Sequence, residues 1–422
     1  MHVFPRIPPR SIRSLPLRVS LVAFCIAASL FPLGCGQGAN RGATPQGAPI
    51  VRVLILENVA TVEISANDPP TLRTGSGVVS RIGLAHNAQA AIVLTASGWR
   101  VGDLPLGSGE LRIEPAKEGD VRLDGHAYRG AYRLVPKSIS RFDVINDVDI
   151  DGYLMGVLDK EMLTYWHPAA YRAQAIVART YAIYVARTSS AGAGYDLFSD
   201  TRSQVYGGIS AESAKSRNAV EATRGVVVAA GEPGQERIFK AYFSSCCGGI
   251  TQSASAAFGD PPSEALSEQN VGTRCSASPH FSWGPVTLSK AEVTRRLRLW
   301  GTRHNLPEKS IGEVARIDIL SVNRYGRPES FTVTDRSGRL YRLGCEELRV
   351  AIGTDAADGN KLLSGFCRPI NDIDSITFAE GHGLGHGVGL CQWCAEAEAT
   401  AGIPHEQIVL QAYPRSVLVR AY

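Results

Sequence analysis

Residues 147–182 read DVDIDGYLMGVLDKEMLTYWHPAAYRAQAIVARTYA, and the spacing of apolar residues in this stretch predicts two consecutive helices. The first helix is indicated by apolar residues that recur three and four positions apart, namely Ile150, Tyr153, Leu154, Val157 and Leu158. The second helix should begin at residue 168, a proline suited to a first helical turn, and end before the glycine at 192. A helical pair therefore forms the centre from which the rest of the fold is inferred.

One acidic residue of the first predicted helix falls on its apolar face. Glu161 comes three residues after Leu158 and four after Val157, so it belongs to the inward stripe. Burial disfavours a charged carboxylate and raises its pKa toward the range in which it donates a proton near neutrality. The alternative is that Glu161 caps the helix end or pairs with Arg172 or Arg179.

The sequence on either side of this helical pair is rich in short β-branched runs. Residues 50–140 alternate such runs with Gly, Pro, Asn and Asp, which predicts a β-rich N-terminal region with a small sheet or barrel. Residues 141–422 add a third helix at 211–225, strands, a basic amphipathic helix from 290 to 300 and a last helix after 394. The predicted fold class is α+β.

The first 35 residues predict an export signal of the lipoprotein type. Arginines precede the apolar run 19–33, and Gly34-Cys35 follows where a lipoprotein is cleaved and its cysteine lipidated. Residues 36–49 are rich in Gly, Gln, Asn and Pro and would form a flexible tether. Pro32 stands where such signals usually carry Leu, so plain secretion is the alternative. The net charge of +4 over 422 residues gives no basic stripe, and nucleic acid is not an expected partner.

Three further motifs follow the helical pair in a fixed order. They are SQVYGG at 203–208, YFSSCCGG at 242–249 and GLGHGVGLCQ at 383–392. Together with the stretch at 147–182, these blocks resemble the stage II sporulation protein D family, which is the SpoIID/LytB domain. The resemblance covers roughly residues 143–413, and it assigns 141–422 as a SpoIID-like catalytic domain.

The resemblance implies a lytic transglycosylase that cleaves the glycosidic bond between N-acetylmuramic acid (MurNAc) and N-acetylglucosamine (GlcNAc) in peptidoglycan. Glu161 takes the place of the single catalytic glutamate, acting first as acid and then as base to leave 1,6-anhydro-MurNAc ends. No cofactor is required for that step. The alternative is a role that relatives of this family also have, that of a non-catalytic peptidoglycan-binding enhancer of an amidase. Either function places the chain in the periplasm or cell envelope, lipid-anchored to the membrane through Cys35, with peptidoglycan and other cell-wall hydrolases as partners.

The same resemblance implies a set of residues that bind the glycan. Glycines at alternate positions of the last motif allow close approach of backbone to substrate. The simpler alternatives are a surface salt bridge for Arg179, core packing for Tyr206 and a structural turn for the loop around His386. The implied substrate-binding residues are Arg179, Gln204, Tyr206, Ser244, His386 and Gln392.

Nine cysteines leave an odd number once Cys25 and Cys35 are set aside, so they do not all pair in disulfides. Some relatives hold zinc near the second motif, and the ligands that this implies here are Cys246, Cys247, Cys275 and His280. The competing interpretation is a disulfide between Cys275 and either Cys246 or Cys247. Two positions, 391 and 394, depart from the family by carrying cysteines where small residues are expected, and this pair alone is a weak zinc signal. A zinc hydrolase using the histidines at 382 and 386 is disfavoured, because that run is too rich in glycine to form a helix.

Overall fold

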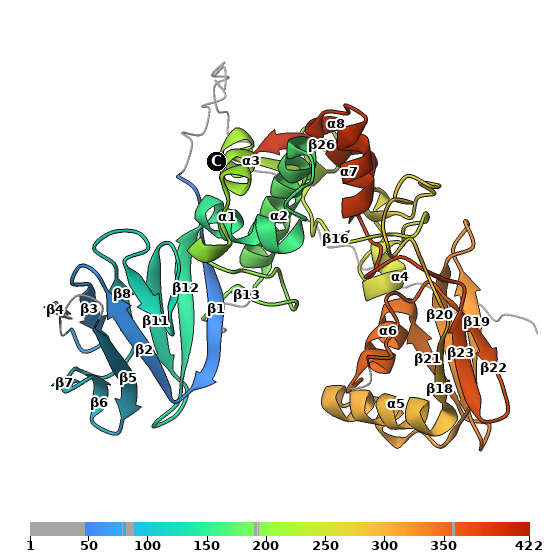
Figure 1. Cartoon of the computed structure of the whole chain (residues 1–422), viewed down its shortest axis with the longest axis horizontal. Coiled ribbons are helices and arrows are strands. Elements are labelled where there is room, and N and C mark those ends of the chain that lie inside the picture. The colour runs from blue at the N-terminus through green and yellow to red at the C-terminus, as the bar shows by residue number, and fades with distance from the viewer. Residues whose placement is uncertain (1–46, 78, 82–87, 190–191, 193, 357–358) are drawn as a thin grey trace, which may run out of the picture. The chain divides into compact units, whose positions relative to one another are not determined.

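The computed structural model describes residues 47–422 except 78, 82–87, 190–191, 193 and 357–358 (Figure 1). The predicted signal at 1–35, the lipidation site Cys35 and most of the tether at 36–49 lie outside the described residues. None of the helices that are described has the length and apolar character needed to cross a membrane. The fold class is α+β, as predicted (Figure 1).

Two sheets that share one apolar core form the N-terminal region. In strand order, the first contains β13 (Leu197–Phe198), β1 (Ile50–Val59), β12 (Phe142–Asp149), β11 (Ala131–Pro136), β8 (Leu111–Glu114), β3 (Thr71–Thr74) and β4 (Val79–Arg81). The second contains β10 (His126–Ala127), β9 (Val121–Leu123), β2 (Thr61–Ala66), β5 (Gln89–Thr95), β6 (Gly98–Val101) and β7 (Leu104–Pro105). Alternating residues of both sheets enter the core, where the Trp99 and Phe142 rings meet edge to face at 5.0 Å. The β structure extends past the predicted boundary at 140, because β12 pairs with both β1 and β11.

The predicted helical pair follows β12 directly. The helices are α1 (Ile150–Glu161) and α2 (Pro168–Thr188), and α3 (Ala214–Ala222) packs against both. The starts of α1 and α2 agree with the apolar spacing and with Pro168 at the first turn. The apolar faces of these helices form a second core, which includes Tyr153, Leu154, Val157 and Leu158.

The C-terminal segment returns to this second core. A sheet of β15 (Arg237–Ile238), β14 (Val226–Ala230) and β26 (Ser416–Arg420) is accompanied by the parallel pair β16 (Phe243–Ser244) and β25 (Leu390–Cys391). The helices here are α4 (Ala254–Phe258), α7 (Gln392–Thr400) and α8 (His405–Ala412), and α7 and α8 pack on α2. The prediction of one last helix after 394 was wrong, because α7 begins at Gln392 and is followed by α8 and β26.

A third core lies between two three-stranded sheets and two helices (Figure 1). The sheets are β18 (Val286–Ser289), β23 (Ser375–Ala379) and β22 (Arg368–Asn371), and β19 (Val314–Val322), β20 (Pro328–Asp335) and β21 (Leu340–Gly344). The helices are α5 (Lys290–His304) and α6 (Cys345–Gly353), and β17 (Ser282–Trp283) pairs with β24 (Gly381–His382). Short 3-10 turns complete the order: η2 (Ile209–Ala211), η3 (Glu264–Leu266) and η4 (Pro307–Ser310).

Candidate active site

Glu161 is the last residue of α1, a helix with a well-defined start. Asp149 caps that start by accepting a hydrogen bond of 2.9 Å from the Gly152 amide, which satisfies one free N–H of the first turn. The apolar stripe of α1 is fully buried, and Glu161 continues this stripe as a partly buried residue. The predicted inward position of its side chain follows from this helical phase.

A loop packed against α1 holds the carboxylate. Gly156 permits this close packing, because a Cβ there would lie 2.7 Å from the Tyr206 ring. The Val205 amide of the same loop donates a hydrogen bond of 3.1 Å to Oε1 of Glu161. The backbone of this loop therefore helps to orient the carboxylate.

The environment of Glu161 favours its protonated form. Burial raises the pKa of the carboxyl group above its ordinary value of 4.5, and the Val205 amide and the Gln392 side chain oppose this shift only in part. No cation lies among the causes that lower this pKa, so neither Arg172 nor Arg179 is its partner. The structure therefore does not support the simple ion pair with Arg172 or Arg179.

Glu161 lines a cleft of about 470 Å³, here called the Glu161 cleft. The cleft is bounded by the end of α1, by α2, by the loop 201–205, by the β16 segment, by α4, by α6 and by the glycine-rich loop 384–386. Its polar and aromatic lining residues are Glu161, Tyr181, Thr201, Arg202, Ser203, Lys240, Tyr242, Phe243, Ser244, Ser245, Phe258, Glu346, Arg349 and His386. Segments far apart in the sequence thus meet around one carboxyl group.

Two predicted substrate-binding residues lie near Glu161: Ser244 in the cleft wall and Gln392 beside the carboxyl group. Ser244 lines the cleft, and its buried Oγ has no hydrogen-bond partner among the described residues. Gln392 is close enough to Glu161 to lower its pKa, although its buried Nε2 makes no hydrogen bond of standard geometry within the described chain. Buried polar groups without partners are uncommon, and here they offer hydrogen bonds to a polar ligand.

His386 also lines the cleft, as a neutral imidazole. Burial lowers its pKa to about 4. Its Nδ1 accepts a hydrogen bond of 3.0 Å from the Val388 amide, and its ring meets the Phe258 ring at 5.1 Å. At neutral pH the residue contributes a polar, uncharged wall to the cleft.

Arg179 does not reach the cleft, which corrects its predicted contact with substrate. The side chain is completely buried beneath α1 and α3, where Nη2 lies 3.1 Å from Oδ1 of Asp151. Its other hydrogen bonds go to Thr223, Tyr422 and the carbonyl groups of residues 220 and 226. Arg179 instead joins the helices to the C-terminal strand region.

Gln204 and Tyr206 also point away from the cleft, although their neighbours line it. The Gln204 side chain is fully buried and accepts a hydrogen bond of 3.2 Å from the Tyr153 hydroxyl. The Tyr206 hydroxyl donates to Asn146 at 3.0 Å, and its ring packs against that of Tyr153 at 4.9 Å. Both residues support the loop that holds Glu161, so stacking of Tyr206 on a sugar is not supported.

Several lining residues were not predicted from the sequence. Tyr181 comes from α2, and burial, together with the charge of Glu161, raises the pKa of its hydroxyl. Lys240 lies over the Tyr242 ring at 4.9 Å, and Arg349 donates a hydrogen bond of 2.8 Å to Glu346. A signal existed only for Tyr181, which lies in the ARTYA segment of the quoted stretch. The others come from segments whose proximity only the fold reveals.

A buried arginine fastens the glycine-rich loop to the second motif. Arg327 donates to the carbonyl oxygens of Cys247 at 3.1 Å, Ile250 at 2.7 Å and His386 at 3.0 Å. Gly387, with φ of +74°, makes room for this guanidinium, since a Cβ there would lie 2.2 Å from Nη1. The loop glycine is therefore required by packing as well as by backbone conformation.

The cysteines form a cluster that differs from the predicted metal ligands. The sulfur atoms of Cys247, Cys275, Cys391 and Cys394 all lie within 4.8 Å of one another, and all four residues are buried. Cys246 and His280 are not members of this group, which corrects that part of the prediction. Cys391 joins the cluster because β25 pairs with β16, which places Cys391 opposite Ser244 of the second motif.

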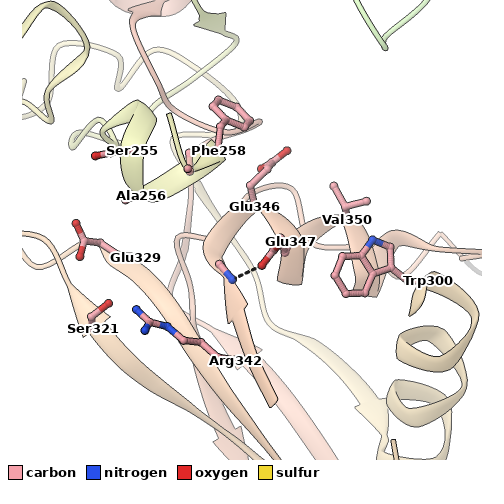
Figure 2. A pocket seen from close by; sticks show the side chains of 13 residues that line it. Ser255, Ala256, Phe258, Trp300, Ser321, Glu329, Arg342, Glu346, Glu347 and Val350 are labelled. Carbon is pink, nitrogen blue, oxygen red and sulfur yellow. Dashed lines mark hydrogen bonds between the residues drawn. The ribbon is translucent and has the colours of Figure 1, made fainter. Parts of the chain in front are cut away.

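A second cavity of about 600 Å³, here called the α6 cavity, lies between α4, α6 and the β19–β21 sheet (Figure 2). Figure 2 shows Glu329, Ser321 and Arg342 on one side and Trp300 and Val350 on the other. Its lining shares Phe258 and Glu346 with the Glu161 cleft. The two cavities therefore adjoin at these residues.

The cleft brings two carboxyl groups together with polar, basic and aromatic side chains. Of the described residues that line it, Glu346 is the other carboxylate, and its two hydrogen bonds with Arg349 keep it paired. Glu161 has no such cation and carries the raised pKa. It is the group in the cleft best suited to act as a general acid.

Comparison with known proteins gives a match over the helical centre of the chain. The sequence profile of a family described as Stage II sporulation protein, SpoIID, matches residues 138–229. The chain is 24% identical over 365 residues to an uncharacterized protein of Brachyspira hyodysenteriae, covering 84% of this chain and 90% of that protein. It is 26% identical over 346 residues to the amidase enhancer of Bacillus subtilis, covering 73% of this chain. The match spans 46% of the length of the amidase enhancer.

Proposed function

Because the SpoIID family profile matches residues 138–229, we propose that this chain is a lytic transglycosylase that cuts the glycan strands of peptidoglycan. The family match and the similarity to an amidase enhancer support a cell-wall-associated function. The finer proposal depends on one observation: a partly buried carboxyl group, Glu161, lines a cleft and has a raised pKa.

In the proposed reaction Glu161 acts twice. Its protonated carboxyl gives the proton to the glycosidic oxygen as the bond from that oxygen to C1 of MurNAc breaks, and GlcNAc leaves with a hydroxyl group. The resulting carboxylate takes the proton of the C6 hydroxyl of the same MurNAc, whose oxygen bonds to C1. The proton returns to Glu161, no water is consumed, and the product is a 1,6-anhydro ring.

The arrangement around Glu161 suits both roles. Burial favours the acid form before the reaction, while the Val205 amide stabilises the carboxylate that forms when the proton leaves. The cyclisation uses the sugar's own hydroxyl, so the paired carboxylates of hydrolytic glycosidases are not needed. Glu346 can then remain paired with Arg349 throughout.

The adjoining cavities suit a polymer rather than a single disaccharide. Phe258 lies at their junction, is 38% exposed and stacks on Tyr242 at 4.5 Å. Exposed aromatic rings of this kind pack well against the apolar faces of sugars. We propose that a glycan strand continues from the Glu161 cleft past Phe258 into the α6 cavity. Export and lipid attachment through Cys35 stay predictions from the sequence.

A second candidate function is a peptidoglycan-binding enhancer of an amidase. It is favoured by the similarity to a protein of that name. In that case the cleft would bind glycan, and the proton-donating form of Glu161 would have no catalytic use. The two proposals differ in whether new glycan ends are produced.

Mass spectrometry of digested glycan strands separates them. Purified strands freed of stem peptides are incubated with the full chain, with Glu161→Gln, or with Glu221→Gln, which changes an exposed carboxylate on α3. We expect anhydro-MurNAc ends, lighter by one water than hydrolysed ends, from the first and third proteins and none from Glu161→Gln. Absence of new ends with every protein, together with stimulation of an added amidase, would favour the enhancer.

A further inference from the structure

Four cysteine sulfur atoms converge beside the β16–β25 pair, where Cys391 lies opposite Ser244, a residue of the cleft wall. Cys247 and Cys275 are 0% exposed, and Cys391 and Cys394 are 4% and 7% exposed. They come from three separate segments: the loop after β16, the loop before β17, and the junction of β25 with α7. Such convergence needs an explanation, because thiols from distant segments have no strong attraction for one another.

The spacing of the sulfur atoms matches tetrahedral coordination of one ion. Zn–S bonds of about 2.3 Å in a tetrahedron place sulfur atoms roughly 3.8 Å apart. Here the sulfur atoms of Cys247 and Cys275 are 3.6 Å apart, and all four lie within 4.8 Å. A disulfide would need a separation of about 2.05 Å, and in the described chain all seven cysteines are free.

The backbone around the cluster is also typical of a thiolate site. The Cys247 amide donates to the sulfur of Cys391 at 3.3 Å, and hydrogen bonds to sulfur stabilise a bound thiolate. The next residues, Gly248 and Gly249, have φ of +69° and +97° and turn the chain sharply after the ligand. The fourth sulfur, from Cys394, is supplied by the first turn of α7.

We propose that Cys247, Cys275, Cys391 and Cys394 bind one structural Zn²⁺ ion. All four positions of the tetrahedron are taken by thiolates, so the ion has no open position for substrate and its role is structural. A soft, four-sulfur tetrahedral set favours zinc over magnesium or calcium. This metal site does not depend on the transglycosylase proposal.

The position of the site gives it a second consequence. Gln392 and Trp393 lie between the ligands Cys391 and Cys394, and Gln392 is the side chain beside Glu161. Trp393 meets the Trp166 ring edge to face at 5.0 Å, on the segment that follows α1. The ion would therefore hold Gln392 in place against the catalytic carboxyl, as a positioning element rather than a participant.

Metal analysis of matched variants tests the proposal. We expect one zinc per chain by mass spectrometry of the full protein purified without chelator, and one for both Cys246→Ser and His280→Ala, which change residues outside the set. Cys394→Ser should lose the zinc. Cobalt substitution of the unaltered protein should give the intense visible bands of a tetrahedral four-thiolate site, and this readout remains informative if Cys394→Ser fails to fold.

Alkylation mapping addresses the competing chemistry. After denaturation with chelator and without reductant, the proposal predicts that all four cluster thiols are alkylated. Cluster cysteines that stay blocked until reductant is added would overturn it in favour of disulfides. The absence of bound metal, iron in place of zinc, or loss of zinc from Cys246→Ser would also overturn it.

Discussion

Replacing Arg179 by methionine should destabilise the fold without removing a substrate contact. The guanidinium is 0% exposed and lies 3.1 Å from Oδ1 of Asp151, which also accepts a hydrogen bond of 2.6 Å from Tyr422. Removing one partner of a buried ion pair leaves a buried charge uncompensated, at a cost of about 3–5 kcal/mol. The lower end applies here, because Arg224 lies 3.5 Å from the other oxygen of Asp151. We therefore expect the free energy of unfolding to fall by about 3 kcal/mol.

Denaturant unfolding followed by circular dichroism measures this loss. Arg187→Met is the matched control, because it changes an exposed arginine of the same helix and should cost less than about 1 kcal/mol. The double variant Asp151→Asn/Arg179→Met should lose less than Arg179→Met alone, since the stranded charge is gone. Unchanged stability combined with loss of glycan cleavage per folded molecule would refute the structural role and restore the predicted sugar contact.

Two other predictions concern the glycine-rich loop and Glu161. Gly387→Ala should lower the free energy of unfolding by more than about 2 kcal/mol, because the new Cβ meets Arg327 at 2.2 Å in addition to the strain of positive φ. Gly402→Ala, also at positive φ but in open space, should cost about 1–2 kcal/mol, and equal losses would contradict the packing argument. Glu161→Gln should be more stable than the unaltered chain near neutrality. The raised pKa means that the folded state binds the Glu161 proton more tightly than the unfolded state does. The unaltered chain therefore has this extra stability below the unfolded-state pKa and loses it as pH rises through the folded-state pKa. The advantage of Glu161→Gln should therefore grow in urea titrations as pH rises from about 4.5 through the folded-state pKa, and a constant or shrinking difference over that range would contradict the raised pKa.

The sequence predicted the features that depend on local periodicity. Apolar spacing located α1 and Pro168 located the start of α2. Helical phase also placed Glu161 on the inward face, where the structure has it. These features follow from neighbours three and four residues away, which a single sequence displays directly.

Features that depend on distant segments were predicted less well. Nothing near Arg179 in the sequence indicates that Asp151 and the C-terminal Tyr422 enclose it. The four-cysteine cluster was not predicted for the same reason, because only the pairing of β16 with β25 brings Cys391 to Cys247. The β structure likewise passed its predicted boundary, since strand pairing rather than composition decides where a sheet ends.

The protonation of Glu161 can be measured directly by carbon-13 NMR of side-chain carboxyl groups in glutamate-labelled protein. The spectrum of Glu161→Gln identifies the missing signal, and a pH titration of that signal in the unaltered chain gives its pKa. We expect the midpoint to lie above the ordinary value of 4.5, as burial at the cleft requires. A midpoint at or below 4.5 would show a solvated or cation-paired carboxylate, and Glu161 could not then serve as the acid proposed here.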